Sequence, residues 1–84
     1  MAVHLSALVP ILLETAKYQR SQNIRVLSLE ALHEITIGFP YHEIFPLKKE
    51  IIRGLEACLD DKKRRVRRAA VKCRNAYFVI SKSQ

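Results

Sequence analysis

The sequence is short of several residue types, and each shortage removes a class of protein. Two cysteines in 84 residues are too few for a disulfide framework, so a reducing compartment is the expected setting. No apolar run approaches the roughly eighteen residues that a membrane-spanning helix needs. The N-terminus also lacks the basic, apolar and small-residue succession of a secretion signal. A chain of this length is expected to form one small domain.

Patterns that carry catalysis or metal binding are also missing. The glycines Gly38 and Gly54 stand alone, so there is no phosphate-binding loop. The two cysteines form no C-x-x-C pair, and buried thiols are the favoured interpretation, because zinc and cluster sites need three or four suitably spaced ligands. His4, His33 and His42 are scattered, without a carboxylate at a spacing suited to metal or base chemistry. We expect no enzyme activity, no cofactor and no bound metal.

Acidic residues are absent from the last part of the chain. Residues 62–84 carry nine basic and no acidic side chains, whereas residues 1–61 carry six basic and eight acidic ones. The net charges of the two parts are therefore +9 and −2. Such an asymmetry favours an acidic partner, whether protein, nucleic acid or an anionic surface.

What the sequence does contain is helical periodicity. Apolar spacings of three and four predict a first helix over about 5–16, bent at Pro10, and a second over about 23–37, ended by a left-handed Gly38. Leu29 and Leu32 widen the apolar arc of the second helix. In an isolated chain, this side of the second helix and the first helix are expected to be exposed and to self-associate. The predicted core stripes are Leu5, Leu8, Val9, Leu12, Leu13 and Ala16, then Ile24, Leu27, Ala31 and Ile35.

Two more helices are predicted in the second half. A connector over 38–46, with a short helical turn at 41–45, leads to a third helix that begins at Pro46. Asp60 and Asp61 end that helix and are expected to cap the fourth. The predicted stripes are Leu47, Ile51, Leu55, Cys58 and Leu59, then Val66, Ala69, Ala70, Cys73, Tyr77 and Ile80.

The two halves repeat with an offset of 42 residues, which places Ile24-Arg25 on Val66-Arg67 and Leu13-Glu14 on Leu55-Glu56. This period is typical of HEAT or armadillo repeats. The expected fold is all-α, an α–α superhelix of two HEAT-type hairpins in a single domain, 1–84, cut from a longer solenoid. Repeat one spans about 3–37 and repeat two about 46–80.

Particular motifs resemble HEAT repeats. Leu8–Leu13 resembles their proline-bearing first helix, and Asp60-Asp61 followed by Val66-Arg67-Arg68-Ala69 resembles their Asp…Val-Arg-x-x-Ala signature. About residues 5–80 are also similar to the C-terminal end of a narrower family, the methyl-methanesulfonate-sensitivity (Mms) scaffolds of the cytosolic iron–sulfur assembly (CIA) targeting complex. The segments that carry this likeness are 42–48, 53–55, 59–67 and 74–78, with Asp60-Asp61-Lys62-Lys63-Arg64-x-Val66-Arg67 the most specific.

This resemblance implies an adaptor of the cytoplasm and nucleus. It would hand apo-proteins of DNA replication, repair and transcription to the machinery that inserts iron–sulfur clusters. The family's C-terminal repeats dock the other two targeting subunits, so those subunits are the implied partners and the apo-proteins indirect ones. The chain matches only the tail of such a solenoid, so client recognition by upstream repeats lies outside it.

The candidate contact surface is the basic stretch, in which eight of the thirteen residues 62–74 are Lys or Arg. A solvated helix face is the alternative to an acidic partner. Val71, Phe78 and Val79 lie off the core face, and they either form a small apolar contact rimmed by cations, pack under the C-terminal tail or are simply exposed. Arg25 and Arg67 are interpreted as structural arginines that bond acids or carbonyls of an adjacent turn. The predicted partner-binding residues are Lys62, Lys63, Arg64, Arg65, Arg68, Val71, Lys72 and Phe78.

Direct nucleic-acid binding is the rival function, because the net +9 of the last part of the chain would attract phosphates. Against it, only Asn75 on the fourth helix suits base reading. The aromatic residues Tyr77 and Phe78 cluster at the end instead of alternating with the cations. Nucleic acid is therefore the secondary partner, and no membrane partner is expected.

Overall fold

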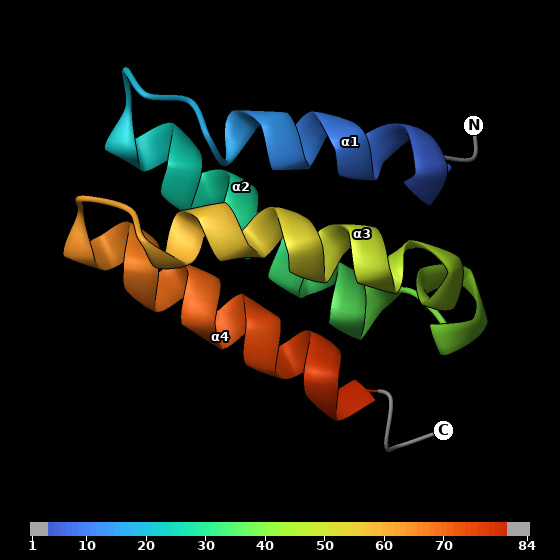
Figure 1. Cartoon of the computed structure of the whole chain (residues 1–84). Coiled ribbons are helices and arrows are strands. Elements are labelled where there is room, and N and C mark those ends of the chain that lie inside the picture. Colours follow the sequence, from blue (N-terminus) through green and yellow to red (C-terminus); the bar gives the residue numbers. More distant parts are fainter. Residues whose placement is uncertain (1–3, 81–84) are drawn as a thin grey trace.

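The computed structural model describes residues 4–80, and those residues form four helices and no strand. The helices are α1 (Leu5–Thr15), α2 (Gln22–Gly38), α3 (Tyr41–Leu59) and α4 (Arg64–Ile80). Two antiparallel hairpins, α1–α2 and α3–α4, stack so that α1 lies beside α3 and α2 beside α4 (Figure 1). This arrangement confirms the predicted all-α class of HEAT-like hairpins. None of these helices is long and apolar enough to cross a bilayer.

Three of the four predicted core faces are confirmed. Leu5, Val9 and Leu13 of α1 are buried, as are the central apolar residues of α3 and α4. Gly54 brings α3 close to α1, since a Cβ at this position would lie 2.6 Å from Cδ2 of Leu13. The other predicted residues of these three faces are buried or half-buried in the same core.

The predicted core face of α2 is correct only in part, because Ile35 is buried and Ala31 half-buried, whereas Ile24 is 39% exposed. Leu27 is 62% exposed, whereas Leu29 and Leu32, expected to be exposed, are fully buried between the hairpins. Two polar side chains, Arg25 and Ser28, take buried positions instead. The cause lies in partners distant in the sequence: Arg25 pairs with Asp61, and the Ser28 hydroxyl bonds that of Thr15. Because these contacts satisfy their polar groups, Arg25 and Ser28 can be buried, and α2 is oriented with this side toward the core.

The connection between the hairpins is shorter than predicted. α2 includes Gly38, and α3 already begins at Tyr41, so the short turn expected at 41–45 is the first part of α3. Gly38 is not left-handed, and no described glycine has a positive φ. Pro46 lies inside α3, not at its first position. Proline removes one backbone donor and crowds the preceding turn, and Figure 1 shows the first turn of α3 bent away from the rest.

The start of α4 also differs from the prediction. Helical hydrogen bonding begins at the Lys63 carbonyl, which accepts the backbone N–H groups of Val66 and Arg67, both at 3.1 Å. Asp61 caps the turn before the helix instead, where its carboxylate accepts the Lys63 N–H at 2.8 Å. Asp60 is the residue at the end of α3. The aspartates therefore order the α3–α4 turn, and four basic residues follow at its exit.

Candidate functional site

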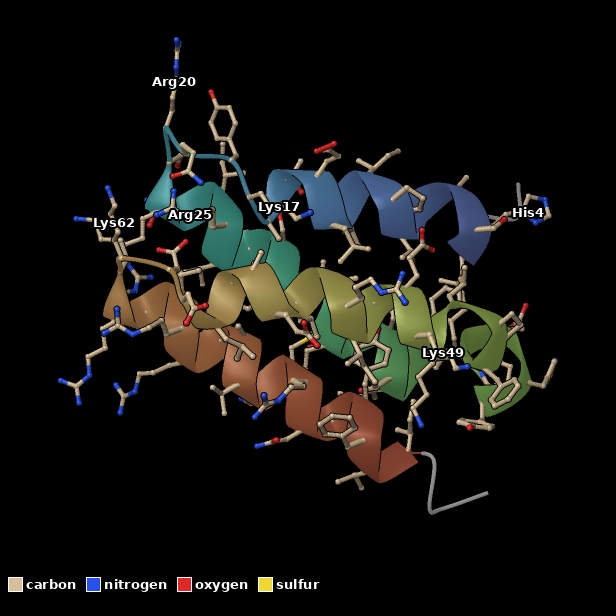
Figure 2. All side chains as sticks on the ribbon, in the orientation of Figure 1. His4, Lys17, Arg20, Arg25, Lys49 and Lys62 are labelled. Carbon is tan, nitrogen blue, oxygen red and sulfur yellow. The ribbon has the colours of Figure 1, made fainter. Side chains whose placement is uncertain are left out.

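The eight residues predicted to contact a partner are all exposed, and they occupy the α3–α4 turn and the outer side of α4. Lys62 and Lys63 lie in the turn. Figure 2 shows Lys62 at the same end of the molecule as Arg25. Of the other six residues, four line two surfaces, and Arg65 and Phe78 line neither. One is a hollow on the side of α4 away from the first hairpin, and the other is a groove between α4 and α2.

The hollow, which we call the end hollow, combines apolar and basic side chains. Leu59 of α3 and Val71 of α4 supply its apolar part; Val71 is 40% exposed. The remaining lining residues are Arg64, Arg67, Arg68, Lys72 and Asn75. Among residues 4–80, no acidic side chain forms an ion pair with any of these four cations. An apolar centre rimmed by unneutralised cations suits an acidic and apolar protein surface.

Phe78 lies further along α4, beyond the hollow, and is 46% exposed. The guanidinium carbon of Arg74 lies 5.8 Å from the centre of the Phe78 ring, within the range of a cation–π contact. Phe78 is therefore held by a neighbour on its own helix. It extends the apolar strip of Val71 by two turns.

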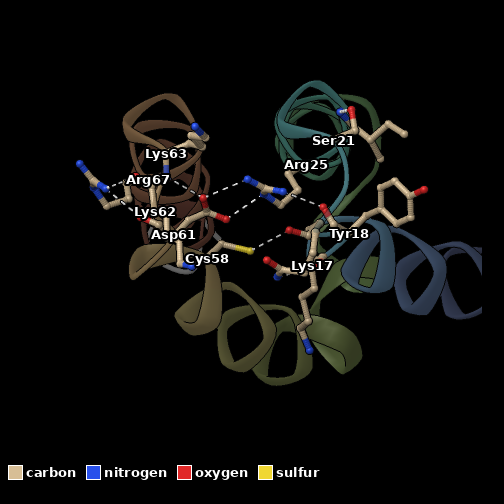
Figure 3. Close-up of polar contacts among 12 residues, drawn as sticks. Lys17, Tyr18, Ser21, Arg25, Cys58, Asp61, Lys62, Lys63 and Arg67 are labelled. Atoms are coloured by element: carbon tan, nitrogen blue, oxygen red, sulfur yellow. Dashed lines mark hydrogen bonds and ion pairs between the residues drawn. The ribbon is translucent and has the colours of Figure 1, made fainter.

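Arg25 and Arg67 hold the α3–α4 turn from two sides (Figure 3). Arg25 Nε lies 2.8 Å from Asp61 Oδ2, and another nitrogen of the same guanidinium donates to the Tyr18 carbonyl at 2.7 Å. Arg67 donates to the backbone carbonyls of Asp61 and Lys62, at 2.8 and 3.2 Å. These are contacts of the kind expected for structural arginines. They fix the exit of the turn and hence the direction in which the α4 cations point.

The groove side of α4 carries Arg65, Arg68 and Lys72. Arg65 donates to the side-chain oxygen of Asn23 on α2, at 3.5 Å. Arg68 and Lys72 line both the groove and the end hollow, so they form the ridge between the two. Four of the eight predicted residues therefore line these two surfaces, and two of the four are common to both.

Cys58 and Cys73 are buried free thiols. The Cys58 thiol donates to the Ala16 carbonyl at 3.4 Å, which joins the two hairpins. Burial, and then the neighbouring Cys58, raise the pKa of Cys73 from 9.0 to about 12, so the thiol stays protonated at neutral pH. Within residues 4–80, no group of three or more His, Cys, Asp or Glu side chains is arranged to hold a metal ion.

Sequence reasoning missed several residues of these surfaces. Leu59 and Asn75 line the end hollow but were assigned to the core and to base reading. Glu30 and Glu34 of α2 line the groove and were not singled out. The repeat offset of 42 residues carried the signal, because it aligns Glu30 with Lys72 on the neighbouring helix.

Comparison with known proteins gives consistent relatives, although no family model matches the chain. It is 35% identical over 79 residues to the MMS19 nucleotide excision repair protein homolog of Dictyostelium discoideum, covering 94% of this chain. It is 39% identical over 79 residues to the Drosophila melanogaster protein of that name, covering 92%, and 35% identical over 80 residues to the human homolog, covering 95%. The chain spans only 7–8% of the length of these relatives.

Proposed function

Because the chain belongs to the MMS19 family, we propose that it is a protein-docking scaffold module that binds partner subunits of the cytosolic iron–sulfur assembly targeting complex. Docking there helps deliver iron–sulfur clusters to apo-proteins of DNA metabolism, in the cytoplasm and nucleus. The role is one of binding and not of catalysis. The relatives' names link the family to nucleotide excision repair, which agrees with clients of this kind.

The end hollow is the observation that carries this proposal. Leu59 and Val71 give it an apolar centre, and the surrounding cations have no acidic partner among residues 4–80. Exposed ion pairs contribute only about 0.2–1 kcal/mol each, so the cations mainly steer and orient a partner, while the apolar centre supplies affinity. The hollow therefore fits a partner surface on which acidic side chains surround an apolar one.

The test is binding of the chain to the two purified targeting subunits. Arg64→Glu combined with Val71→Ser alters two residues that line the end hollow but not the groove. We expect this variant to lose at least tenfold in affinity while its far-ultraviolet circular dichroism stays unchanged. Lys49→Glu, a charge reversal at an exposed position of α3, is the matched control and should bind normally. Undiminished binding by the double variant would remove the end hollow from the account.

Nucleic acid remains the second candidate, because the cations of the hollow also suit phosphates and Asn75 lies among them. Titration with labelled duplex DNA separates the two functions. Micromolar affinity that collapses above physiological salt indicates incidental electrostatics, whereas tight binding that survives such salt favours the nucleic-acid function.

A further inference from the structure

The groove between α2 and α4 differs from the end hollow in the sign of its charges. The two helices run in the same direction: Arg65 meets Asn23 near their starts, and the Tyr77 hydroxyl donates to the Leu32 carbonyl, at 2.6 Å, further along both. The groove between them holds about 560 Å³. Its α2 wall presents carboxylates and its α4 wall presents cations.

Each wall repeats its charge after one helical turn. Glu30 and Glu34 are exposed on α2, and Arg68 and Lys72 are exposed on α4, so each pair is four residues apart on one side of its helix. No ion pair joins these acids to these cations within the described residues. The two rows of charge therefore face solvent across the groove and are available to an external partner.

The part of the groove between the charged rows is apolar. Ala31 and Ala69 are small, half-buried residues, and small side chains let another chain approach closely. Leu27 stands at the rim and is 62% exposed, although it is a large apolar residue on a central helix. An occupant with an apolar centre would cover Leu27, which the fold itself leaves uncovered.

We propose that the α2–α4 groove binds an amphipathic helix of a protein partner, with an apolar centre, an acidic edge against Arg68 and Lys72, and a basic edge against Glu30 and Glu34. A helix fits because its own edges repeat every four residues, the spacing of both walls. This assignment rests on the proposed function, since both take the docking partner to be a protein. It adds to the end hollow a second contact surface, at which the partner helix can bind in only one orientation. Reversing the helix edges would set like charges together, so the groove selects orientation.

The acidic wall argues against the other occupants. A nucleic-acid strand in the groove would bring its phosphates toward Glu30 and Glu34, and like-charge contact opposes that binding. Phosphates suit the end hollow better, because its described lining residues include no acid. The groove and the end hollow therefore suit different partners, because only the groove has a negatively charged wall.

The experiment uses two labelled helical peptides and fluorescence anisotropy. The mixed probe has Leu and Ala at its centre, Glu along one edge and Lys along the other, and in the acidic probe every Lys is replaced by Glu. Glu30→Lys combined with Glu34→Lys should weaken the mixed probe at least tenfold and strengthen the acidic probe. Leu27→Ser should weaken the mixed probe severalfold. Phe45→Ser, at a residue 61% exposed near the start of α3, is the matched control and should have no effect.

Several outcomes overturn the proposal. The first is failure of the mixed probe to bind the folded wild-type chain, and the second is equal affinity of wild type for both probes. A third is loss of probe binding as the chain is concentrated, which would assign the groove to a second copy. Arg64→Glu with Val71→Ser lies outside the groove and should leave the mixed probe bound. Wild type that binds the mixed probe but not the targeting subunits would count against the proposed function alone, and wild type that binds the subunits but not the probe would count against the groove alone.

Discussion

At the scale of single residues, Arg25 is the side chain that ties the two hairpins together. It reaches from the start of α2 to Asp61 in the α3–α4 turn, and the two side chains are only 6% and 10% exposed. Removing one member of such a buried pair leaves the other charge without compensation, which costs about 3–5 kcal/mol. The turn that presents the α4 cations therefore depends on a residue of the first hairpin.

We accordingly expect Arg25→Ala to lower the free energy of unfolding by about 3 kcal/mol in urea titrations. Adding Asp61→Ala should cost less than the sum of the single changes, because the second change removes the unpaired carboxylate. Arg20→Ala, at an exposed arginine of the preceding turn, is the control and should cost under 0.5 kcal/mol, on the order of an ordinary surface change. Additive losses would mean that Arg25 and Asp61 act independently.

The buried Cys73 thiol makes stability depend on alkaline pH. Burial, together with Cys58, raises the pKa of Cys73 in the folded chain to about 12. Above the ordinary pKa of 9.0, the unfolded thiol releases its proton and the folded one retains it, so stability is full below that pH and falls as pH rises toward 12.

The free energy of unfolding should therefore decline between pH 9 and pH 11, with this one thiol contributing up to about 1.4 kcal/mol per pH unit. Cys73→Ala should make the decline shallower, whatever its effect on stability at pH 7. The measurement is a series of urea titrations at fixed ionic strength. An identical slope in the variant would show that this thiol does not govern the alkaline loss.

At the scale of elements, α4 is destabilised by repulsion between like charges on its exposed side. Arg64 and Arg68, and Arg68 and Lys72, are like charges at four-residue spacing, each pair destabilising an isolated helix by about 0.2–0.5 kcal/mol. All three residues are exposed, and none forms an ion pair within residues 4–80. Residues that destabilise a helix in this way persist where binding to a partner requires them.

Arg68→Glu should therefore stabilise the chain while it weakens docking. It replaces two repulsive pairs by two attractive ones, which amounts to about 1 kcal/mol and a rise of about 4–8 °C in the melting temperature. Affinity for the targeting subunits should fall in the same variant, because Arg68 lies on the ridge shared by the end hollow and the groove. A variant that is both less stable and fully competent in binding would contradict this interpretation of α4.

The same elements show what periodicity can and cannot predict. α1, α3 and α4 each bury one apolar stripe, and the spacing of three and four identified it. α2 is apolar on several sides, so spacing alone did not choose between Leu27 and Leu29. Its orientation depends on Arg25 and Ser28, whose partners Asp61 and Thr15 lie far along the chain. The α4 cations were predictable from composition, but their division between two surfaces required the position of α2.

At the scale of the whole molecule, the first hairpin leaves large apolar side chains uncovered. Ile11 of α1 and Ile24 and Ile37 of α2 are exposed, whereas Leu29 and Leu32, the residues first expected there, are buried. In a stack of helical repeats, neighbouring repeats bury such residues. We predict that the isolated chain self-associates through exposed apolar residues of the first hairpin.

Sedimentation velocity over a range of concentrations tests that prediction. The sedimentation coefficient of wild type should rise with concentration, and Ile11→Ser with Ile24→Ser should reduce the rise. Phe45→Ser is the matched control, because Phe45 is also an exposed apolar residue but lies at the start of α3. Unchanged association in the double variant would place the contact elsewhere.

A competition experiment decides whether the basic surface of α4 docks protein partners of the targeting complex. The chain is immobilised, the two purified targeting subunits are passed over it, and total DNA is added as competitor. We expect binding that survives the DNA and is lost in Arg64→Glu with Val71→Ser. Absence of binding with the folded chain would contradict the docking function, and binding that DNA abolishes would assign the basic surface to nucleic acid.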